Sequence, residues 1–210
     1  MDAVVGFDLP KFMFSFFPRI DFGGSLFHQA PMGLRFDIGL ERVFRAVKIF
    51  EFAFGKEEDF ILVSQDWNSP DKFQERSMPL FETPGILDVS SDCFKTVEVF
   101  PFDEPKYSLT WVCTKFAKFD KDLLFQTIAN RERGRLPSIE SGVYLIEPVS
   151  RIIMHMYDDR GLEIVATDAT TLSQIYREYE EWILEYDRPK IVQRFKNASE
   201  YAKEQIDSLR

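Results

Sequence analysis

Hydrophobic and polar positions alternate most regularly over residues 33–38 of this chain. Leu34 and Phe36 fall on one side of that stretch, and Arg35 and Asp37 fall on the other. A side-chain period of two is typical of a strand that buries one face. The pattern therefore predicts a strand over residues 33–38 that carries its charged side chains away from the core.

A longer period follows this strand. Over residues 40–54 apolar residues recur every three or four positions, and the pattern stops at Gly55, which predicts a helix. The apolar run 60–63 predicts a short buried strand, so that strand, helix and strand together have the size of a βαβ unit. Further along, residues 96–100 and 107–115 predict a hairpin, because the second of these stretches alternates cleanly.

The last third of the chain carries the clearest pattern. Residues 143–146, 151–157 and 162–167 predict three strands with short connections. The turn 158–161 reads Asp-Asp-Arg-Gly, in which Asp side chains bond the turn backbone and Gly supplies a positive φ. Two helical stripes then run to the C-terminus, so residues 142–210 are predicted to form a three-strand meander followed by two helices.

Two stretches lack a clear period. Residues 1–32 are rich in Phe and Pro, and we expect them to form an irregular arm. Residues 66–92 contain scattered charges and prolines and predict a long loop, which is uncommon unless it is functional. This loop is interpreted either as a lid or partner-contacting segment, or as an ordered surface excursion with a short helix.

The order of these elements predicts the fold class. Strands and helices neither alternate throughout nor form a pure meander, which favours an α+β fold. We expect a mixed or mostly antiparallel sheet with helices packed mainly on one face and a C-terminal helix pair. Residues 1–210 are expected to form a single domain, since 210 residues fit one large domain.

Composition narrows the classes of function. The chain has 35 acidic and 26 basic residues and a net charge of −9, and nucleic-acid binding needs clustered basic residues. We therefore expect no nucleic-acid partner, and an acidic surface better suits a basic protein partner. Phe occurs 22 times, which indicates a Phe-rich core or, alternatively, an exposed contact patch.

The sequence also bears on compartment and cofactors. No stretch approaches the ~20 apolar residues of a membrane span, and the first residues do not resemble a secretory signal. We therefore expect a cytoplasmic protein without a membrane partner. Cys93 and Cys113 have neither a CxxC nor a metal-binding spacing, and Cys113 is expected to be a reduced, buried thiol. No cofactor is indicated, and the pattern carries no information on oligomeric state.

The predicted hairpin turn is the most polar cluster in the sequence. Its two adjacent carboxylates would suit a divalent cation, although their spacing is not that of a calcium loop. His155 and Glu163 would face each other across the hairpin as an acid/base pair, whereas the simpler interpretation is that Asp and Gly only shape the turn. No catalytic residue and no metal ligand are assigned. The candidate binding residues are Arg35, Asp37, His155, Asp158, Asp159, Arg160 and Glu163.

Four segments of the chain form a recognisable set. They are Gly-Leu-Arg-Phe-Asp-Ile-Gly at 33–39, Arg-Ala-Val-Lys-Ile-Phe at 45–50, Tyr-Asp-Asp-Arg-Gly-Leu-Glu-Ile-Val-Ala at 157–166, and Tyr-Asp-Arg at 186–188. Together they resemble a bacterial family of unknown function that is common in Bacillus-type organisms. Asp37 stands where many members of that family have Glu, which keeps the charge on a shorter side chain. The resemblance implies one cytosolic domain, and it implies no activity and no catalytic residue.

Three hypotheses of function follow. The first is a non-enzymatic protein-binding module, such as an antitoxin-like or immunity-like protein that presents an acidic surface to a basic partner. The alternative is a metal-assisted hydrolase that uses Asp158 and Asp159, with Glu163 or His155. The third is a regulatory or small-molecule module with a pocket between the sheet and the N-terminal arm.

Overall fold

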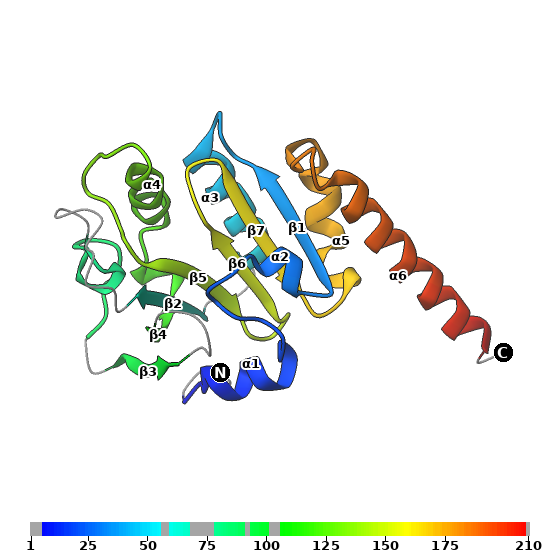
Figure 1. Ribbon diagram of the computed structural model, residues 1–210, viewed down its shortest axis with the longest axis horizontal. Coiled ribbons are helices and arrows are strands. Elements are labelled where there is room, and N and C mark those ends of the chain that lie inside the picture. Colours follow the sequence, from blue (N-terminus) through cyan, green and yellow to red (C-terminus); the bar gives the residue numbers. More distant parts are fainter. Residues whose placement is uncertain (1–5, 56–58, 68–77, 91–92, 101–105, 209–210) are drawn as a thin grey trace.

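The protein is built around one antiparallel sheet (Figure 1). The computed structural model describes residues 6–55, 59–67, 78–90, 93–100 and 106–208, with side chains up to residue 198. Within these residues seven strands form a sheet in the order β1-β7-β6-β5-β2-β4-β3, and each neighbouring pair is antiparallel. The strands are β1 (Met32–Asp37), β2 (Asp59–Trp67), β3 (Lys95–Val99), β4 (Tyr107–Lys115), β5 (Gly142–Glu147), β6 (Ile152–Met156) and β7 (Gly161–Ala166).

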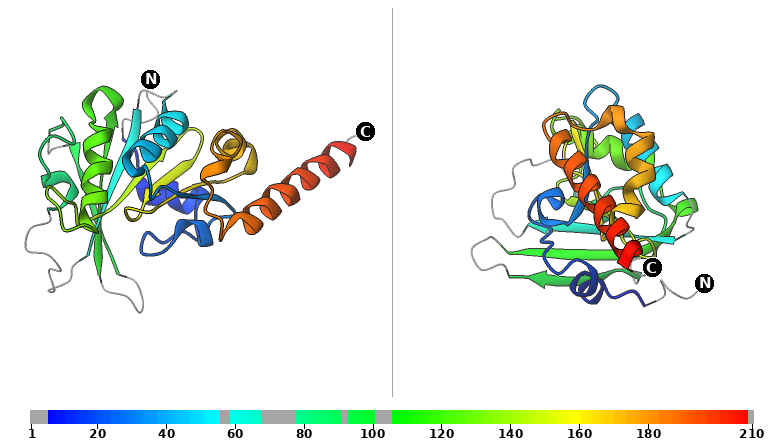
Figure 2. Two further views of the ribbon diagram at one scale, coloured as in Figure 1. Left: turned by 90° about the horizontal axis from the view of Figure 1, so that it is seen from above. Right: turned by 90° about the vertical axis from the view of Figure 1, so that its right-hand side faces the viewer.

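Helices cover the two faces of the sheet unequally. The helices are α1 (Leu9–Phe16), α2 (Leu26–Gln29), α3 (Arg42–Phe54), α4 (Lys121–Arg131), α5 (Ala169–Glu178) and α6 (Arg188–Ser208). Buried residues of α3, α4 and α5 share one hydrophobic cluster with one face of the sheet, and α1 packs with the other face. The far end of α6 projects away from the body of the protein (Figures 1 and 2).

The Phe residues form much of the core. Phe50 and Phe54 of α3, Phe60 of β2 and Phe125 of α4 are fully buried, and Phe50 makes ring contacts with the other three. Such ring pairs add to the stabilisation that comes from burying apolar area. The expectation of a Phe-rich core is therefore confirmed.

The predicted fold class is also confirmed, and the sheet is antiparallel throughout the part that the structure describes. The two strands of the predicted βαβ unit are not neighbours in the sheet. β1 and β2 run in the same direction, but β7, β6 and β5 lie between them. The last strand of the C-terminal meander, β7, pairs with β1, and Arg35 lies opposite Glu163 in this pair. Residues far apart in the sequence therefore meet there.

The N-terminal residues are more regular than expected. Instead of an irregular arm, residues 9–16 form α1, because Asp8 caps the helix by accepting a hydrogen bond from Lys11 N at 3.0 Å. Pro10 occupies the first turn, where its missing N–H costs nothing. The chain then returns along the sheet and forms the short α2.

The predicted loop 66–92 is corrected in its extent. Asp66 and Trp67 belong to β2, and a short 3-10 helix covers Leu80–Glu82. Leu80 and Ile86 are buried in the main cluster, so residues 78–90 form an ordered excursion with a short helix. The remaining part of the predicted loop, residues 68–77 and 91–92, lies outside the described residues.

Two predicted helical stripes are longer than the helices that form. The stripe over residues 40–54 gives a helix that begins only at Arg42, and Leu40 is 90% exposed. The next-to-last stripe, expected to reach Tyr186, gives a helix only as far as Glu178, and Tyr186 is exposed. This helix ends early because the chain then covers the edge of β1, where Leu184 N donates to Arg35 O at 2.8 Å.

Candidate functional site

A pocket lies between the N-terminal segment 22–25 and the sheet, and we call it the arm pocket. Its volume is about 360 Å³, within the size range of small-molecule sites. Strands β1, β2, β5, β6 and β7 and the residues that precede β5 contribute to its wall. The lining polar and aromatic side chains used below are Arg35, Gln65, Trp67, Arg131, Glu140, Tyr144, His155, Tyr157 and Glu163.

Arg35 holds three parts of the chain together at one wall of the arm pocket. Its Nη1 atom lies 2.9 Å from Asp187 Oδ2, and its Nη2 donates to Tyr157 Oη at 3.2 Å. Its Nε atom lies 3.7 Å from Glu163 Oε1. Asp187 and Glu163 are almost completely buried, so Arg35 is the cation that compensates two buried carboxylates.

Glu163 attaches the N-terminal segment to the sheet. Its Oε1 accepts from Ser25 Oγ and its Oε2 accepts from Phe27 N, each at 2.7 Å. The carboxylate therefore ties residues 25–27 to β7 with two charge-assisted hydrogen bonds. The predicted pairing of His155 with Glu163 across the hairpin is confirmed in register, although each side chain bonds elsewhere.

His155 and Tyr144 form the floor of the arm pocket. Their rings stack at a centroid distance of 4.2 Å. His155 Nδ1 lies 2.8 Å from Val143 O, which can only accept, so Nδ1 carries the proton and Nε2 is an acceptor. Burial lowers the pKa of His155, against the opposing effects of this hydrogen bond and of Glu163. The histidine is therefore neutral near pH 7.

Tyr144 is also held in its protonated form. Burial raises the pKa of its hydroxyl, and the charge of Glu163 adds to the effect. The hydroxyl lies within hydrogen-bond distance of two acceptors, Phe22 O and Gln65 Oε1. Tyr144 thus links the N-terminal segment to β2 beneath the pocket.

Three polar atoms at the arm pocket lack a hydrogen-bond partner among the described residues: Gln65 Nε2, Glu140 Oε1 and Arg35 Nε. Gln65 is only 2% exposed, and a buried polar group without a partner costs about 1–3 kcal/mol. Six such atoms occur in the described part of the chain, so half of them meet at one pocket. This concentration marks the arm pocket as a place where polar groups await a partner.

The hairpin turn differs from the arm pocket. Asp158 Oδ1 accepts from Arg160 N and Gly161 N at 2.7 Å, and Arg160 pairs with its other oxygen at 3.0 Å. Asp159 forms an ion pair with Arg42 at 2.9 Å and lies 3.5 Å from Arg133. The carboxylates that suggested a cation site are therefore engaged by the fold itself.

The glycine of this turn has a different role from the predicted one. Gly161 does not have a positive φ. A Cβ atom at this position would overlap the ring of Tyr157, so glycine allows the aromatic ring to lie against the strand. The same ring reaches Arg35, which places Tyr157 between the turn and the arm pocket.

The structure separates the seven predicted candidate residues into two groups. Arg35, His155 and Glu163 line the arm pocket, whereas Asp158, Asp159 and Arg160 form the turn. Asp37 joins neither group, because its Oδ1 accepts from Gly39 N at 2.9 Å in the connection to α3. The pocket residues that the sequence interpretation missed are Gln65, Trp67, Glu140, Tyr144 and Tyr157.

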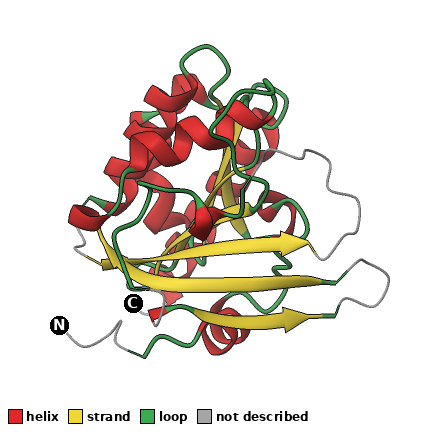
Figure 3. Cartoon of the chain, turned by 90° about the vertical axis from the view of Figure 1, so that its left-hand side faces the viewer, coloured by secondary structure: helices red, strands yellow, loops and turns green. Residues whose placement is uncertain are grey.

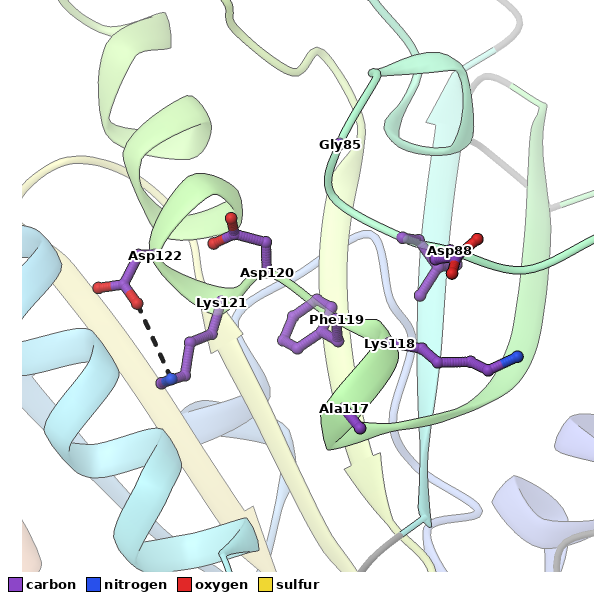
Figure 4. Close-up of a pocket in the computed structure, with 9 residues that line it drawn as sticks. Gly85, Asp88, Ala117, Lys118, Phe119, Asp120, Lys121 and Asp122 are labelled. Atoms are coloured by element: carbon purple, nitrogen blue, oxygen red, sulfur yellow. Dashed lines mark ion pairs between the residues drawn. The ribbon is translucent and has the colours of Figure 1, made fainter.

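A larger hollow of about 630 Å³ lies elsewhere, between residues 85–88 and 117–122 (Figure 4). Its acids serve the fold: Asp120 caps α4 by accepting from Leu123 N at 2.9 Å, and Asp122 lies 3.8 Å from Lys121. It is lined by none of the seven predicted candidate residues and by none of the described residues that have a buried side-chain atom without a hydrogen-bond partner. We therefore place the candidate site in the arm pocket.

Among the described residues, no group of three or more His, Cys, Asp or Glu side chains is arranged to hold a metal ion. None of the helices in the described ranges is long and apolar enough to cross a bilayer.

Comparison with known proteins gives one match. The sequence model of a protein family described as "Domain of unknown function (DUF3885)" matches residues 9–187, which include every residue of the arm pocket. No curated protein and no solved structure matches the chain.

Proposed function

The chain belongs to this DUF3885 family, and we propose that it is a binding protein whose recognition site is the arm pocket. The observation that carries the proposal is that three residues lining one pocket each have a buried polar atom without a hydrogen-bond partner among the described residues. A ligand that bonds to these atoms would remove an unfavourable contribution to the folded state. Binding energy and orientation would then come from the same few polar groups.

The charges of the arm pocket favour an uncharged polar ligand. Arg35 and Arg131 face Glu140 and Glu163, so the formal charges of the lining residues cancel. A phosphate or an isolated cation would meet as much repulsion as attraction. Gln65 and Arg35 offer donors, and Glu140 and His155 Nε2 offer acceptors, which suits a neutral group with both functions.

Trp67 adds an apolar surface at the mouth. It lines the arm pocket and remains 40% exposed, and an exposed Trp gives a ligand a flat surface for contact. The occupant that we propose is therefore a small neutral molecule, or a polar side chain of a partner protein, with one flat or apolar face.

The other two hypotheses of function use surfaces outside the arm pocket as well. An antitoxin-like or immunity-like protein would bind its basic partner through the acidic exterior, with the partner's polar side chain in the arm pocket. That identity of the partner stays a prediction. A metal-assisted hydrolase at Asp158 and Asp159 also stays a prediction, and no contact in the described residues favours it, since both carboxylates are engaged.

The proposal is tested by measuring whether ligand binding depends on the side-chain amide of Gln65. Gln65→Met removes the amide and keeps a similar volume. The matched control is Thr114→Val, because Thr114 Oγ1 is also buried without a partner but lies in β4 outside the arm pocket. Thr114→Val is expected to fold with at least wild-type stability, since it removes a buried polar atom without a hydrogen-bond partner. Gln65→Met is expected to fold with stability close to wild type, because it removes the unpaired Nε2 while Tyr144 Oη, which loses Gln65 Oε1, keeps Phe22 O as its acceptor.

The readouts are a retained ligand and a shift in melting temperature. Small molecules released by denaturing the purified protein are identified by mass spectrometry, and the small-molecule fraction of the source cells is added back to refolded protein. We expect the fraction to raise the melting temperature of wild type and Thr114→Val by mass action, and to leave Gln65→Met unchanged. An equal response of all three proteins, or none, contradicts the proposal.

A further inference from the structure

The two cysteines of the 210-residue sequence lie on the same hairpin. β3 and β4 form the outer edge of the sheet (Figure 3), and their register pairs Lys95 with Trp111. Cys93 lies two residues before Lys95, and Cys113 lies two residues after Trp111. Each cysteine therefore lies two residues beyond this last pair of the ladder, Cys93 in the turn that leads into β3 and Cys113 within β4, so both lie at the same end of the hairpin.

The spacing of the nearest strand pair, Lys95 and Trp111, is compatible with a disulfide just beyond it. Directly opposed residues of an antiparallel pair have Cα atoms about 4.5–5.5 Å apart, and disulfides join Cα atoms about 4.4–6.8 Å apart. Cys93 closes a turn before β3, with its N–H donating to Ser90 O at 3.1 Å. Both cysteines are free thiols in the structure.

The two thiols differ in their surroundings. Cys93 is exposed, whereas Cys113 is half-buried beside the cluster that includes Trp111. Burial raises the pKa of Cys113 to about 11, with smaller effects from Asp59 and from Cys93 itself. The electrostatic interaction between the thiols is a second sign that they are near each other, and the protonated Cys113 leaves Cys93 as the first target of an oxidant.

We propose that Cys93 and Cys113 are a modification site, at which hydrogen peroxide produces a reversible disulfide between the turn before β3 and the end of β4. The Cys93 thiolate attacks one peroxide oxygen, the O–O bond breaks, and hydroxide leaves with Cys93 as a sulfenic acid. Cys113 then attacks the sulfenic sulfur, the S–S bond forms, and water leaves. In sum, two thiols lose two electrons and two protons, and one peroxide becomes two waters.

The disulfide would act on the least supported part of the sheet. β3 has only β4 as a neighbour among the described strands. Lys95 Nζ donates to Phe7 O at 2.8 Å, so the proposed bond would form beside a contact that holds the N-terminal segment. This site is separate from the arm pocket and does not depend on the function proposed for it.

The experiment uses the full chain in its wild-type, Cys93→Ser and Cys113→Ser forms. Each protein is treated with hydrogen peroxide, its remaining thiols are alkylated, and its mass is measured. We expect the wild type to become two hydrogens lighter, to accept no alkyl group and to yield one peptide pair joined through Cys93 and Cys113. Dithiothreitol should restore two alkylatable thiols, and neither variant should form an intramolecular crosslink.

A second readout is stability. The oxidised wild type should melt several degrees above the reduced form, because the bond restricts the unfolded chain, and peroxide should not raise the melting temperature of either variant. Two intact thiols after treatment, separate oxidation of each cysteine, or only intermolecular crosslinks would overturn the proposal.

Discussion

The hairpin turn and the arm pocket are both rich in charged side chains, but they differ in how completely their polar atoms are bonded. In the turn, the carboxylates of Asp158 and Asp159 are bonded to backbone N–H groups or paired with arginines. In the arm pocket, Gln65, Glu140 and Arg35 each keep a buried atom without a hydrogen-bond partner among the described residues. The carboxylates of the turn are thus fully engaged within the protein, whereas the arm pocket keeps polar atoms without a hydrogen-bond partner.

This difference teaches that the density of charged residues is a poor guide to a binding site. Asp and Gly are frequent in turns because they satisfy the backbone locally, so a polar turn needs no ligand. A buried polar atom without a partner costs free energy in the folded state. The unsatisfied atoms are therefore the more informative sign, and they point to the arm pocket.

The largest expected effect comes from removing the carboxylate that closes the arm pocket. Glu163→Met would leave Phe27 N and Ser25 Oγ without their acceptor and would remove one of the two carboxylates that pair with Arg35. Breaking such a buried charged contact costs about 3–5 kcal/mol, which urea unfolding would measure. Glu163→Gln keeps part of the acceptor capacity and should lose less. A loss below about 1 kcal/mol in Glu163→Met would show that this carboxylate does not attach the N-terminal segment.

A smaller loss is expected where the turn and the arm pocket meet. Gly161→Ala places a Cβ in the space of the Tyr157 ring, and such overpacking costs about 1–3 kcal/mol. Because the ring must move away from Arg35, ligand binding in the arm pocket should weaken as well. Urea unfolding and ligand titration measure the two effects.

The control for this prediction is a double-mutant cycle. Tyr157→Leu removes the ring, so the added methyl group of Gly161→Ala should cost much less in that background. An equal cost with and without the ring would mean that Gly161 serves the turn alone, and that the two regions are independent.

Much of the fold was predictable because each strand carries its own short-range pattern. The alternation at Leu34 and Phe36 and the meander after residue 142 gave the antiparallel strands directly. What failed were boundaries that depend on distant contacts. The stripe that was expected to reach Tyr186 ends at Glu178, and Leu184 bonds with Arg35 instead. No local pattern reports a partner almost 150 residues away.

The arm pocket was only partly predictable for the same reason. Arg35, His155 and Glu163 were visible as polar residues in strands that otherwise read as apolar. Gln65 was missed because the buried strand was ended at Val63, although β2 continues to Trp67. A polar residue directly after an apolar run is a weak sign of a buried strand position. Here a long loop was expected from residue 66, so Gln65 was interpreted as lying at the edge of that loop. That Gln65 lacks a partner follows only from the three-dimensional arrangement.

A third prediction concerns the turn by itself. Asp158→Ala removes the acceptor for Arg160 N and Gly161 N, and the loss of such a side-chain cap costs about 1 kcal/mol. Asp158→Asn keeps an acceptor oxygen and should be nearly neutral. Neither variant should change ligand binding, because Asp158 does not line the arm pocket. A specific loss of ligand binding in Asp158→Asn would show that the turn takes part in the binding site.

The smallest expected effect is a pH dependence that arises from the floor of the arm pocket. Burial lowers the pKa of His155 in the folded protein, whereas the unfolded chain takes up a proton near the ordinary value of about 6.5. The unfolded state therefore binds more protons below that pH, and protonation favours unfolding. The stability that the neutral His155 contributes is present above pH ~6.5 and is lost as the pH falls through the window below it.

His155→Gln removes this titration and keeps a side chain that can donate to Val143 O. Its free energy of unfolding, measured by urea at a series of pH values between about 5 and 8, should fall less than that of the wild type on acidification. His28→Gln is the matched control, because His28 is exposed and does not line the arm pocket, and its profile should follow the wild type. If His155→Gln and the wild type run parallel, the imidazole takes up its proton equally in the folded and unfolded states. Its Nε2 would then face water or a charged neighbour, and it could not serve as the neutral acceptor on which the proposed ligand chemistry depends.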